Sequence, residues 1–565
     1  MEANPVRIVQ YFDGEKQSII PLFQRHYTWN NRNWQTLWED IMQCYDNMDP
    51  THFMDSTHFM GAIVSIPART VPVGVTKHLI IDGQQRLLTI AVLLCALRDG
   101  WGEAQRAEQI QDYLANRYYE GSVDYPKILP TQDDREEYSQ LLTPHVNCSR
   151  KSQHLMHEAY LFFKNALLSK DDNDEMIDPN KIFDIVRQCL QVVMINLAET
   201  DDPYVIFESL NYKAEPLTQA DLVRNYILMK FRHSLGPGGE QEKVYKESWL
   251  PLEQLLGNSI DEFLRHYASR DGDNIKKPKI YAAIKAKFSD LKTTDQIEME
   301  IREMRRHGGY YDIFLHPEKE DNQDIKKRLL SLSKMEVSIC YPLLLKLFSA
   351  YEKGQYNENV LSKCLSIIES MILRRTVCDE KRSALNKLFI RLASKFITVV
   401  DPDKWLESEL LRTVRSERWP EDEEFTRALI NNPIYGEKGI RLVLERIETV
   451  LAGKEVIDLS NKKITIEHIM PQQLTEEWKE MLGANYFDIH KQYLDTAGNL
   501  TLTAYNSELG NLPFSEKKKK FLESGIALNR IIANEDVWGQ EQILKRAKFL
   551  ADEAKKLWRR PVAIS

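Results

Sequence analysis

The chain lacks the cysteine pattern of a disulfide-stabilised or zinc-binding protein. Its seven cysteines are scattered and odd in number, and no two are spaced as C-x-x-C. This usage predicts reduced thiols in a cytoplasm and argues against a cysteine-rich zinc site. No apolar run approaches about 18 residues, so no membrane-spanning segment is expected. The first residues also lack the basic flank and apolar core of a signal peptide.

The chain also lacks an excess of positive charge. Its formal net charge is −9 at pH 7, so any surface for nucleic acid must be a local patch. The hydrophobic fraction of 43% and the charged fraction of 28% indicate a globular protein rather than a disordered one. A chain of 565 residues is too long for one core, so two or three domains are expected.

A strand–turn–helix pattern is centred on Asp82 and Gly83. The apolar run 77–81 ends at this pair, and residues 87–97 carry apolar side chains at helical spacing. Gly83 would let the backbone turn sharply. Free N–H groups at the start of a helix favour an anion, and Arg86 could clamp a phosphate there. An ordinary turn with solvated Gln and Arg side chains is the alternative.

A second arginine precedes this pattern in an extended, aromatic-rich segment. Gln24 and Arg25 lie just before Tyr27, and Trp34 follows. Arg25 and Arg86 together favour a phosphate site more than either does alone. The aromatic side chains are expected to be core residues rather than platforms for stacked bases.

Residues 101–235 are predicted to be mostly helical. One helix ends at Asn211, which leaves Glu208 and Asn211 near the following loop as candidates for ligand contact. Thr218 and Asp221 have the spacing of a capping box, which gives Asp221 a structural role.

The glycine-rich segment 236–239 is the clearest linker signal in the chain. Beyond it amphipathic helices dominate as far as about residue 395, without a Gly-rich loop or a metal-ligand spacing. His307, within this block, is expected at the surface. The middle block is interpreted as a helical spacer.

The C-terminal region carries a constellation of polar residues. A short β-branched strand runs into Glu467 and His468, and Asn499 and Asn506 follow. A Mg²⁺-dependent phosphodiesterase needs oxygen ligands and a base, which Glu467 with Asn506 and His468 can supply. A lysine run, which alone is usually a solvated helix face, could neutralise the DNA backbone: Lys517, Lys518, Lys519 and Lys520. From residue 511 to the end, twelve Lys and Arg stand against seven Asp and Glu.

These C-terminal residues resemble the HNH (ββα-metal) nuclease domain that closes the GmrSD-type restriction proteins. The segment Asp82-Gly83-Gln84-Gln85-Arg86 and the sequence around Arg25 and Glu208 look like the nucleotide-binding domain of that family, which is related to the ParB/sulfiredoxin fold. The resemblance covers both ends of the chain and leaves only the helical middle uncharacterised.

The resemblance implies a modification-dependent (type IV-like) antiphage endonuclease of a bacterial cytoplasm. It would cut modified DNA, such as phage DNA with modified cytosine, using Mg²⁺ or Mn²⁺. His468 corresponds to the general base, Glu467 and Asn506 to metal ligands, and Asn499 to the Asn that holds the ββα loop. Many HNH sites have Asp where this chain has Glu467. The first domain would bind and hydrolyse ATP, GTP or UTP through Gln24, Arg25, Asp82, Gly83, Gln84, Gln85, Arg86, Glu208 and Asn211.

The predicted fold is α+β and multidomain. It consists of a nucleotide-binding domain over 1–235, a helical spacer over 236–400, and an HNH domain in a mostly helical surround over 401–565. A homodimer is expected only by analogy with the family. Three alternatives stay open: a nicking NTPase that senses phosphorothioated DNA, a nucleotide-gated DNA-binding protein with an inactive HNH fold, and a ParB-like partitioning factor.

Overall fold

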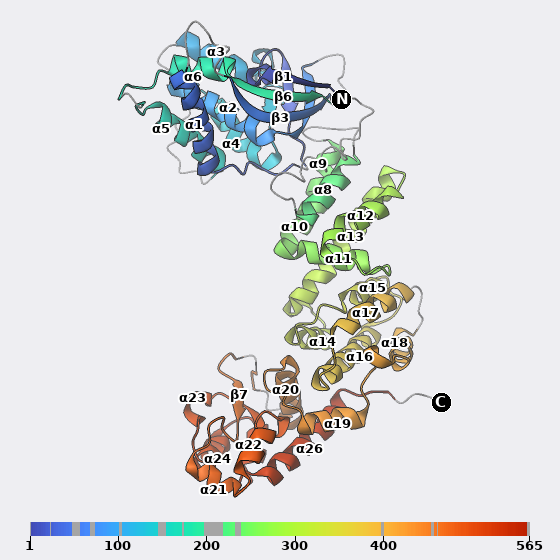
Figure 1. The fold of residues 1–565 in the computed structure, drawn as a ribbon. Coiled ribbons are helices and arrows are strands. Elements are labelled where there is room, and N and C mark those ends of the chain that lie inside the picture. The colour runs from blue at the N-terminus through green and yellow to red at the C-terminus, as the bar shows by residue number, and fades with distance from the viewer. Residues whose placement is uncertain are drawn as a thin grey trace. The chain divides into compact units, whose positions relative to one another are not determined.

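The computed structural model places two compact units along the chain (Figure 1). One unit contains Met1–Pro251 with Ile284–Ile301, and the other contains Leu252–Ala283 with Arg302–Ser565. Within them the structure describes residues 2–22, 24–47, 57–67, 74–100, 104–144, 154–171, 174–196, 218–231, 239–396, 401–453, 457–459 and 461–561. No helix among these residues is both long and apolar enough to cross a membrane.

The first unit is built on a mixed six-stranded sheet of order β1-β6-β3-β4-β2-β5. Neighbours β2–β4, β2–β5 and β3–β6 are parallel, whereas β1–β6 and β3–β4 are antiparallel. The strands are β1 (Glu2–Arg7), β2 (Lys16–Ile19), β3 (His58–Pro67), β4 (Thr76–Asp82), β5 (Ile128–Leu129) and β6 (Leu190–Asn196).

One helix, α2 (Gln84–Gly100), lies at the centre of this unit. Its residues 87–97 are buried on every side, as expected for a helix that is apolar all round. It packs against α3 and α5. The helices of this part are α1 (Asn31–Asn47), α3 (Ala104–Leu114), α4 (Gln132–Leu142), α5 (Leu155–Leu167), α6 (Pro179–Gln188), α8 (Gln219–Met229) and α9 (Glu240–Val244).

The predicted strand–turn–helix around Gly83 is confirmed. β4 ends at Asp82, Gly83 has φ +93°, and α2 begins at Gln84. A Cβ on Gly83 would lie 2.8 Å from Cγ1 of Ile63 and 3.2 Å from the carbonyl oxygen of Ala62. Glycine is therefore required both by the backbone conformation and by the close approach of β3.

The helical middle continues through α10 (Leu250–Leu256), α11 (Ile260–Ser269), α12 (Ile280–Ser289), α13 (Thr294–Leu315), α14 (Gln323–Lys334), α15 (Tyr341–Glu352), α16 (Glu358–Val377) and α17 (Ser383–Lys395). The surface position expected for His307 is wrong. Its side chain is 2% exposed and packs against the rings of Tyr267 and Tyr310.

The C-terminal part contains a two-stranded ribbon inside a helical surround. β7 (Thr465–His468) and β8 (Leu500–Thr503) pair antiparallel, and α24 (Phe514–Glu523) follows them. The surrounding helices are α18 (Pro402–Leu411), α19 (Asp422–Asn431), α20 (Lys438–Ala452), α21 (Glu476–Leu482), α22 (Tyr486–Tyr493), α23 (Asn506–Leu509), α25 (Ala527–Ala533) and α26 (Gln540–Leu557). The fold class is therefore α+β and multidomain.

The boundary expected near residue 400 is not a break in packing. Helix α16 contacts α18, α19 and α20 across it. The buried Arg374 of α16 donates to the carbonyl oxygens of Trp558 at 2.7 Å and Pro420 at 3.2 Å. Most of the helical middle thus lies in one compact unit with the C-terminal segment.

Candidate functional site

The ribbon β7–β8 carries the acid–histidine pair at its end. Glu467 is paired with Thr501 and His468 with Leu500. Because successive side chains of a strand point to opposite faces, Glu467 and His468 lie on different faces of the ribbon. The two residues therefore have separate surroundings, although they are neighbours in the sequence.

Glu467 lies on the face covered by α24. The Lys517 ammonium donates to Oε1 of Glu467 at 2.7 Å and to the carbonyl oxygen of His468 at 2.8 Å. Lys517 is fully buried and Glu467 is 6% exposed. Burial raises the pKa of Glu467, against the opposing effect of Lys517, and burial also lowers the pKa of Lys517. The expected surface role of Lys517 is thus corrected, because its ammonium is an internal counter-ion.

Asn506 begins the short helix α23 beside the same strand. Its side-chain nitrogen donates to Oγ1 of Thr465 at 2.9 Å and to the carbonyl oxygen of Ile466 at 3.1 Å. Thr465 alternates with Glu467 and shares its face of the ribbon. These bonds fix the amide, and they leave its oxygen Oδ1 as the group that could meet a cation.

His468 lies on the other face, against a carboxylate and an aromatic ring. Its Nε2 is 2.9 Å from Oδ1 of Asp495, and its ring centroid is 4.3 Å from that of Tyr435. A carboxylate accepts hydrogen bonds, so Nε2 is the donor in this contact and Nδ1 is the ring nitrogen left for another partner. The backbone N–H groups of Ile434 and Tyr435 donate to the carbonyl oxygen of Asp495 at 2.8 and 3.2 Å.

Asn499 joins the two strands through the loop between them. Its Oδ1 accepts from the backbone N–H of Met470 at 2.7 Å, and its Nδ2 donates to the carbonyls of Met470 at 3.0 Å and Leu494 at 2.9 Å. The indole of Trp538 also donates to Oδ1 at 3.2 Å. Asn499 is fully buried, so it shapes the loop after His468 and does not itself meet a ligand.

The other three lysines of α24 each have a carboxylate partner. Lys518 is paired with Asp536 at 3.0 Å, Lys519 with Glu516 at 2.7 Å and Lys520 with Glu508 at 2.9 Å. Exposed ion pairs of this kind are weak and exchange readily, so DNA phosphates could replace the carboxylates.

The donor set expected for a divalent ion fits only in part. The carboxylate of Glu467 already has the Lys517 ammonium as its cation inside the protein. Asn506 keeps one neutral oxygen, which alone binds a hard cation weakly. Among the described residues, no group of three His, Cys, Asp or Glu side chains is arranged to hold a metal ion.

In the first unit, the glutamines that were predicted to bind nucleotide hold the segment around Arg25 against the turn by hydrogen bonds. Gln24 donates to the carbonyl oxygen of Ile81 at 2.8 Å, and Gln84 donates to that of Arg25 at 3.0 Å. Gln85 donates to the carbonyl oxygen of His26 at 3.0 Å and accepts from the backbone N–H of Thr28 at 2.9 Å. The backbone of Arg25 is therefore held at the start of α2.

Arg86 lies against the irregular part of β3. Its Nη1 donates to the carbonyl oxygen of Ala62, and a Cβ on Gly61 would be 3.3 Å from its Cζ. Gly61 has φ +97° and lies where the register between β3 and β6 shifts. Glycine there leaves room for the guanidinium beside the strand.

One buried polar atom at this turn has no partner. Gln84 is 6% exposed, and its Oε1 has no hydrogen bond. A buried acceptor in that state favours a donor from a ligand, such as a ribose hydroxyl or a base amino group. The turn thus fits a nucleotide by its helix N-terminus and by this acceptor. Asp82 is half-buried at the end of β4, and Glu208 and Asn211 lie outside the described residues.

Two residues beside His468 were not predicted from the sequence. Asp495 lies 27 residues after His468, and Tyr435 belongs to the turn between α19 and α20. The only local signals were an acidic residue four positions before Asn499 and an aromatic residue next to Gly436. Neither pattern indicates contact with a distant histidine.

The fold and the site define a multidomain α+β protein with a histidine–carboxylate pair on a strand–strand–helix motif. A model of the GmrSD restriction endonuclease N-terminal domain matches residues 8–228, and a model of the C-terminal domain of GmrSD restriction endonucleases matches residues 419–553. The chain therefore belongs to the GmrSD restriction endonuclease family, as its sequence motifs predicted. Membership makes it a nuclease, whose partner is DNA. No curated protein matches the chain.

Proposed function

We propose that this protein is an HNH-type DNA endonuclease of phage defence, regulated by a nucleoside triphosphate, with His468 as the general base. The observation that carries the proposal is the contact of Nε2 of His468 with Asp495 at 2.9 Å. That contact leaves Nδ1 as the ring nitrogen for another partner, and a base needs such a nitrogen in order to take a proton. Asn499 holds the loop that follows His468.

The reaction is hydrolysis of a phosphodiester bond. His468 Nδ1 accepts a proton from water while the water oxygen forms a bond to phosphorus. The bond from phosphorus to the leaving sugar oxygen breaks, and that oxygen takes a proton from solvent. Lys518, Lys519 and Lys520 hold the DNA backbone by exchanging their carboxylate partners for phosphates.

A divalent ion, Mg²⁺ or Mn²⁺, is part of the proposal through the family resemblance. When bound, such an ion stabilises charge on the leaving oxygen. Asn506 Oδ1 is the donor that remains for it, whereas Glu467 is committed to Lys517. No step above is assigned to the ion for that reason.

The nucleotide belongs to the turn between β4 and α2. Phosphates of ATP, GTP or UTP would meet the first N–H groups of α2, with Arg25 and Arg86 beside them. Support for this placement comes from the partnerless Oε1 of Gln84. Recognition of modified phage DNA, assembly as a homodimer and a bacterial cytoplasmic setting extend the proposal by family resemblance.

The proposal is tested by a cleavage assay on purified wild-type protein and His468→Ala. The substrates are plain DNA, DNA with glucosylated hydroxymethylcytosine and phosphorothioated DNA, each with Mg²⁺ or EDTA and with or without triphosphates. Removal of a general base is expected to lower the cleavage rate by about a hundredfold to ten-thousandfold, with triphosphate hydrolysis unchanged.

His316→Ala is the matched control, because that histidine is half-exposed in the helical middle. Cutting by His468→Ala at the wild-type rate would remove the assignment of the base. Cutting of phosphorothioated DNA only, in the form of nicks, would identify the sensing variant of the family.

A second candidate is favoured by the ion pair between Glu467 and Lys517. Because this pair uses the carboxylate expected to bind metal, the C-terminal motif could grip DNA without cutting it. The protein would then be a nucleotide-gated DNA-binding protein. DNA binding that is insensitive to EDTA, with no cleavage of any of the three substrates, would establish this candidate over the first.

A further inference from the structure

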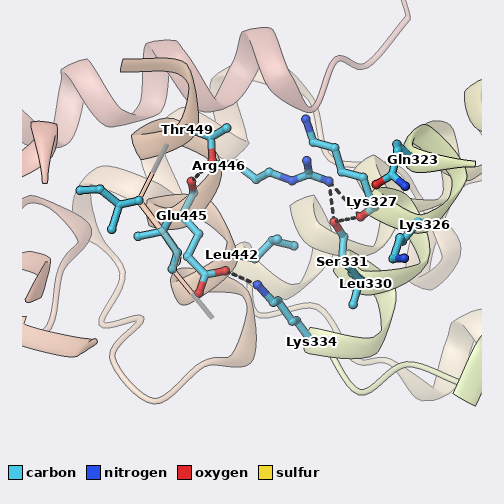
Figure 2. A pocket seen from close by; sticks show the side chains of 12 residues that line it. Gln323, Lys326, Lys327, Leu330, Ser331, Lys334, Leu442, Glu445, Arg446 and Thr449 are labelled. Atoms are coloured by element: carbon cyan, nitrogen blue, oxygen red, sulfur yellow. Dashed lines mark hydrogen bonds and ion pairs between the residues drawn. The ribbon is translucent and has the colours of Figure 1, made fainter. Parts of the chain in front are cut away.

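A pocket of about 330 Å³ lies between α14 and α20 (Figure 2), and none of the site residues described above lines it. Helix α14 contributes Lys327 and Ser331 to its wall, and α20 contributes Glu445 and Arg446. The volume is at the lower end of the range of small-molecule sites. All the residues that line the pocket belong to the second unit.

The one carboxylate of the pocket is already neutralised. Glu445 accepts from the Lys334 ammonium at 2.5 Å and from Nε of Arg441 at 2.8 Å. The ammonium of Lys326, also on the wall, donates to the carbonyl oxygens of Glu318 and Glu320. The positive charges left to face the pocket are those of Lys327 and Arg446.

Arg446 is a fixed cation whose nearest partners are mostly neutral. Its Nη2 donates to Oγ of Ser331 at 2.7 Å and to the carbonyl oxygen of Lys327 at 3.1 Å. The closest carboxylate is Glu369 at 3.8 Å, and Arg328 already binds it at 2.9 Å. Burial lowers the pKa of Arg446 to about 10, which keeps the guanidinium charged at neutral pH.

Figure 2 shows the Arg446 side chain reaching from α20 across to Ser331 of α14. Lys327, whose carbonyl oxygen accepts from Arg446, brings a second positive charge to the same wall, and an anion is attracted to two cations that line one pocket. Guanidinium groups bind phosphate oxygens through paired hydrogen bonds. The polar end of the pocket therefore suits a phosphoryl group.

Four apolar residues also line the wall. Leu330, Leu442, Ile457 and Leu459 line the pocket together with the cations. A wall of this kind favours an organic ligand with a flat or apolar portion over a bare inorganic ion.

We propose that this pocket binds a nucleoside phosphate, with its phosphoryl oxygens on Arg446 and Lys327 and its base or sugar against Leu330 and Leu442. It is a second ligand site, separate from the turn at Gly83. It depends neither on the nuclease assignment nor on the triphosphate proposed for the first unit. Free phosphate and the DNA backbone carry the same phosphoryl chemistry, so the experiment has to separate these sources.

The test is a binding titration of the full-length protein with AMP, with inorganic phosphate and with a short DNA duplex. Lys327→Glu and Arg446→Gln are each expected to weaken AMP binding by about tenfold to a hundredfold, since each removes a charge-assisted bond to phosphate. Lys363→Glu is the matched control, because Lys363 is an exposed lysine of α16 that does not line the pocket. Arg86→Ala, which alters the nucleotide turn of the first unit, separates AMP that is bound at that turn from AMP that is bound in the pocket.

Three results would overturn the proposal. The first is AMP binding that falls with Arg86→Ala but not with the two pocket variants. In the second, the pocket variants weaken binding of the duplex but not of AMP, which would make the pocket a contact for the DNA backbone. In the third, inorganic phosphate binds as tightly as AMP. Lys327 is exposed, so Lys327→Glu keeps the test decisive even if Arg446→Gln lowers the melting temperature.

Discussion

His468 is the residue on which the proposed chemistry depends, and two neighbours determine the orientation of its imidazole. Asp495 engages Nε2, and the ring of Tyr435 covers the imidazole from a turn that is docked on the Asp495 backbone. Both neighbours therefore restrict the orientation of the imidazole. Asp495 acts as a positioning residue in this arrangement, because it meets the base and not the reacting phosphate.

Replacing Asp495 tests this role. In Asp495→Ala the imidazole loses its orienting acceptor, and a drop in kcat of about tenfold to a hundredfold is expected, with DNA affinity unchanged. Asp495→Asn keeps an oxygen acceptor and should recover part of the rate. The measurements are single-turnover cleavage and DNA binding on the same preparations. A loss of binding that matches the loss of rate would instead indicate a structural role.

The pairing of Glu467 with Lys517 was beyond the reach of the sequence. The two residues are 50 positions apart, and a run of four lysines is typical of a solvated helix face. Only the packing of α24 on the ribbon decides which of the four turns inward. By contrast, the burial of Tyr27 and Trp34 was predicted correctly, because large aromatic side chains seldom stay outside a core.

At the scale of elements, local signals predicted the turn between β4 and α2. An apolar run, a glycine and a helical repeat follow one another within about twenty residues, so no distant contact was needed to recognise them. The partners of Gln84 and Gln85 were not predictable, because they lie in a segment nearly sixty residues away. The hydrogen bonds of Gln84 and Gln85 form only once the folded unit brings the segment around Arg25 and His26 against the start of α2.

Gly83→Ala is expected to destabilise the first unit by about 2–4 kcal/mol. Alanine at φ +93° is strained, and its Cβ would press on Ile63 and on the carbonyl oxygen of Ala62. Hydrogen exchange of the amides of α2 measures the effect. Gly100→Ala, at the end of the same helix, meets no atom within 4 Å and should change stability by less than about 0.5 kcal/mol. Equal effects of the two variants would contradict the expectation.

At the scale of the whole molecule, the strongest linker signal does not coincide with the division between the units. Helix α9 and the residues as far as Pro251 follow segment 236–239 but still belong to the first unit. The buried Gln241 donates to the carbonyl oxygen of Leu228 at 2.8 Å, which joins α9 to α8. A glycine-rich sequence predicts a flexible connection, whereas packing of the helices beyond it decides where a unit ends.

His266 and His307, two buried histidines of the helical middle, predict acid sensitivity of the second unit. Burial, and then the charge of Arg265, lowers the pKa of His266 to about 3. Burial and Arg270 lower the pKa of His307 to about 2. In the unfolded chain both would titrate near 6.5, so below that pH the unfolded state binds more protons than the folded state does. Stability is therefore fully present above pH 6.5 and falls as the pH drops toward these folded-state values.

Each of these histidines is expected to lower the free energy of unfolding by about 1.4 kcal/mol for each pH unit below about 6.5. Hydrogen exchange of α11 and α13, corrected for the intrinsic effect of pH, measures this loss between pH 7.5 and pH 5. The double variant His266→Gln, His307→Gln removes both groups and should flatten the slope. His316→Gln should not, because His316 is half-exposed. A slope that survives the double variant would assign the acid sensitivity to other buried groups.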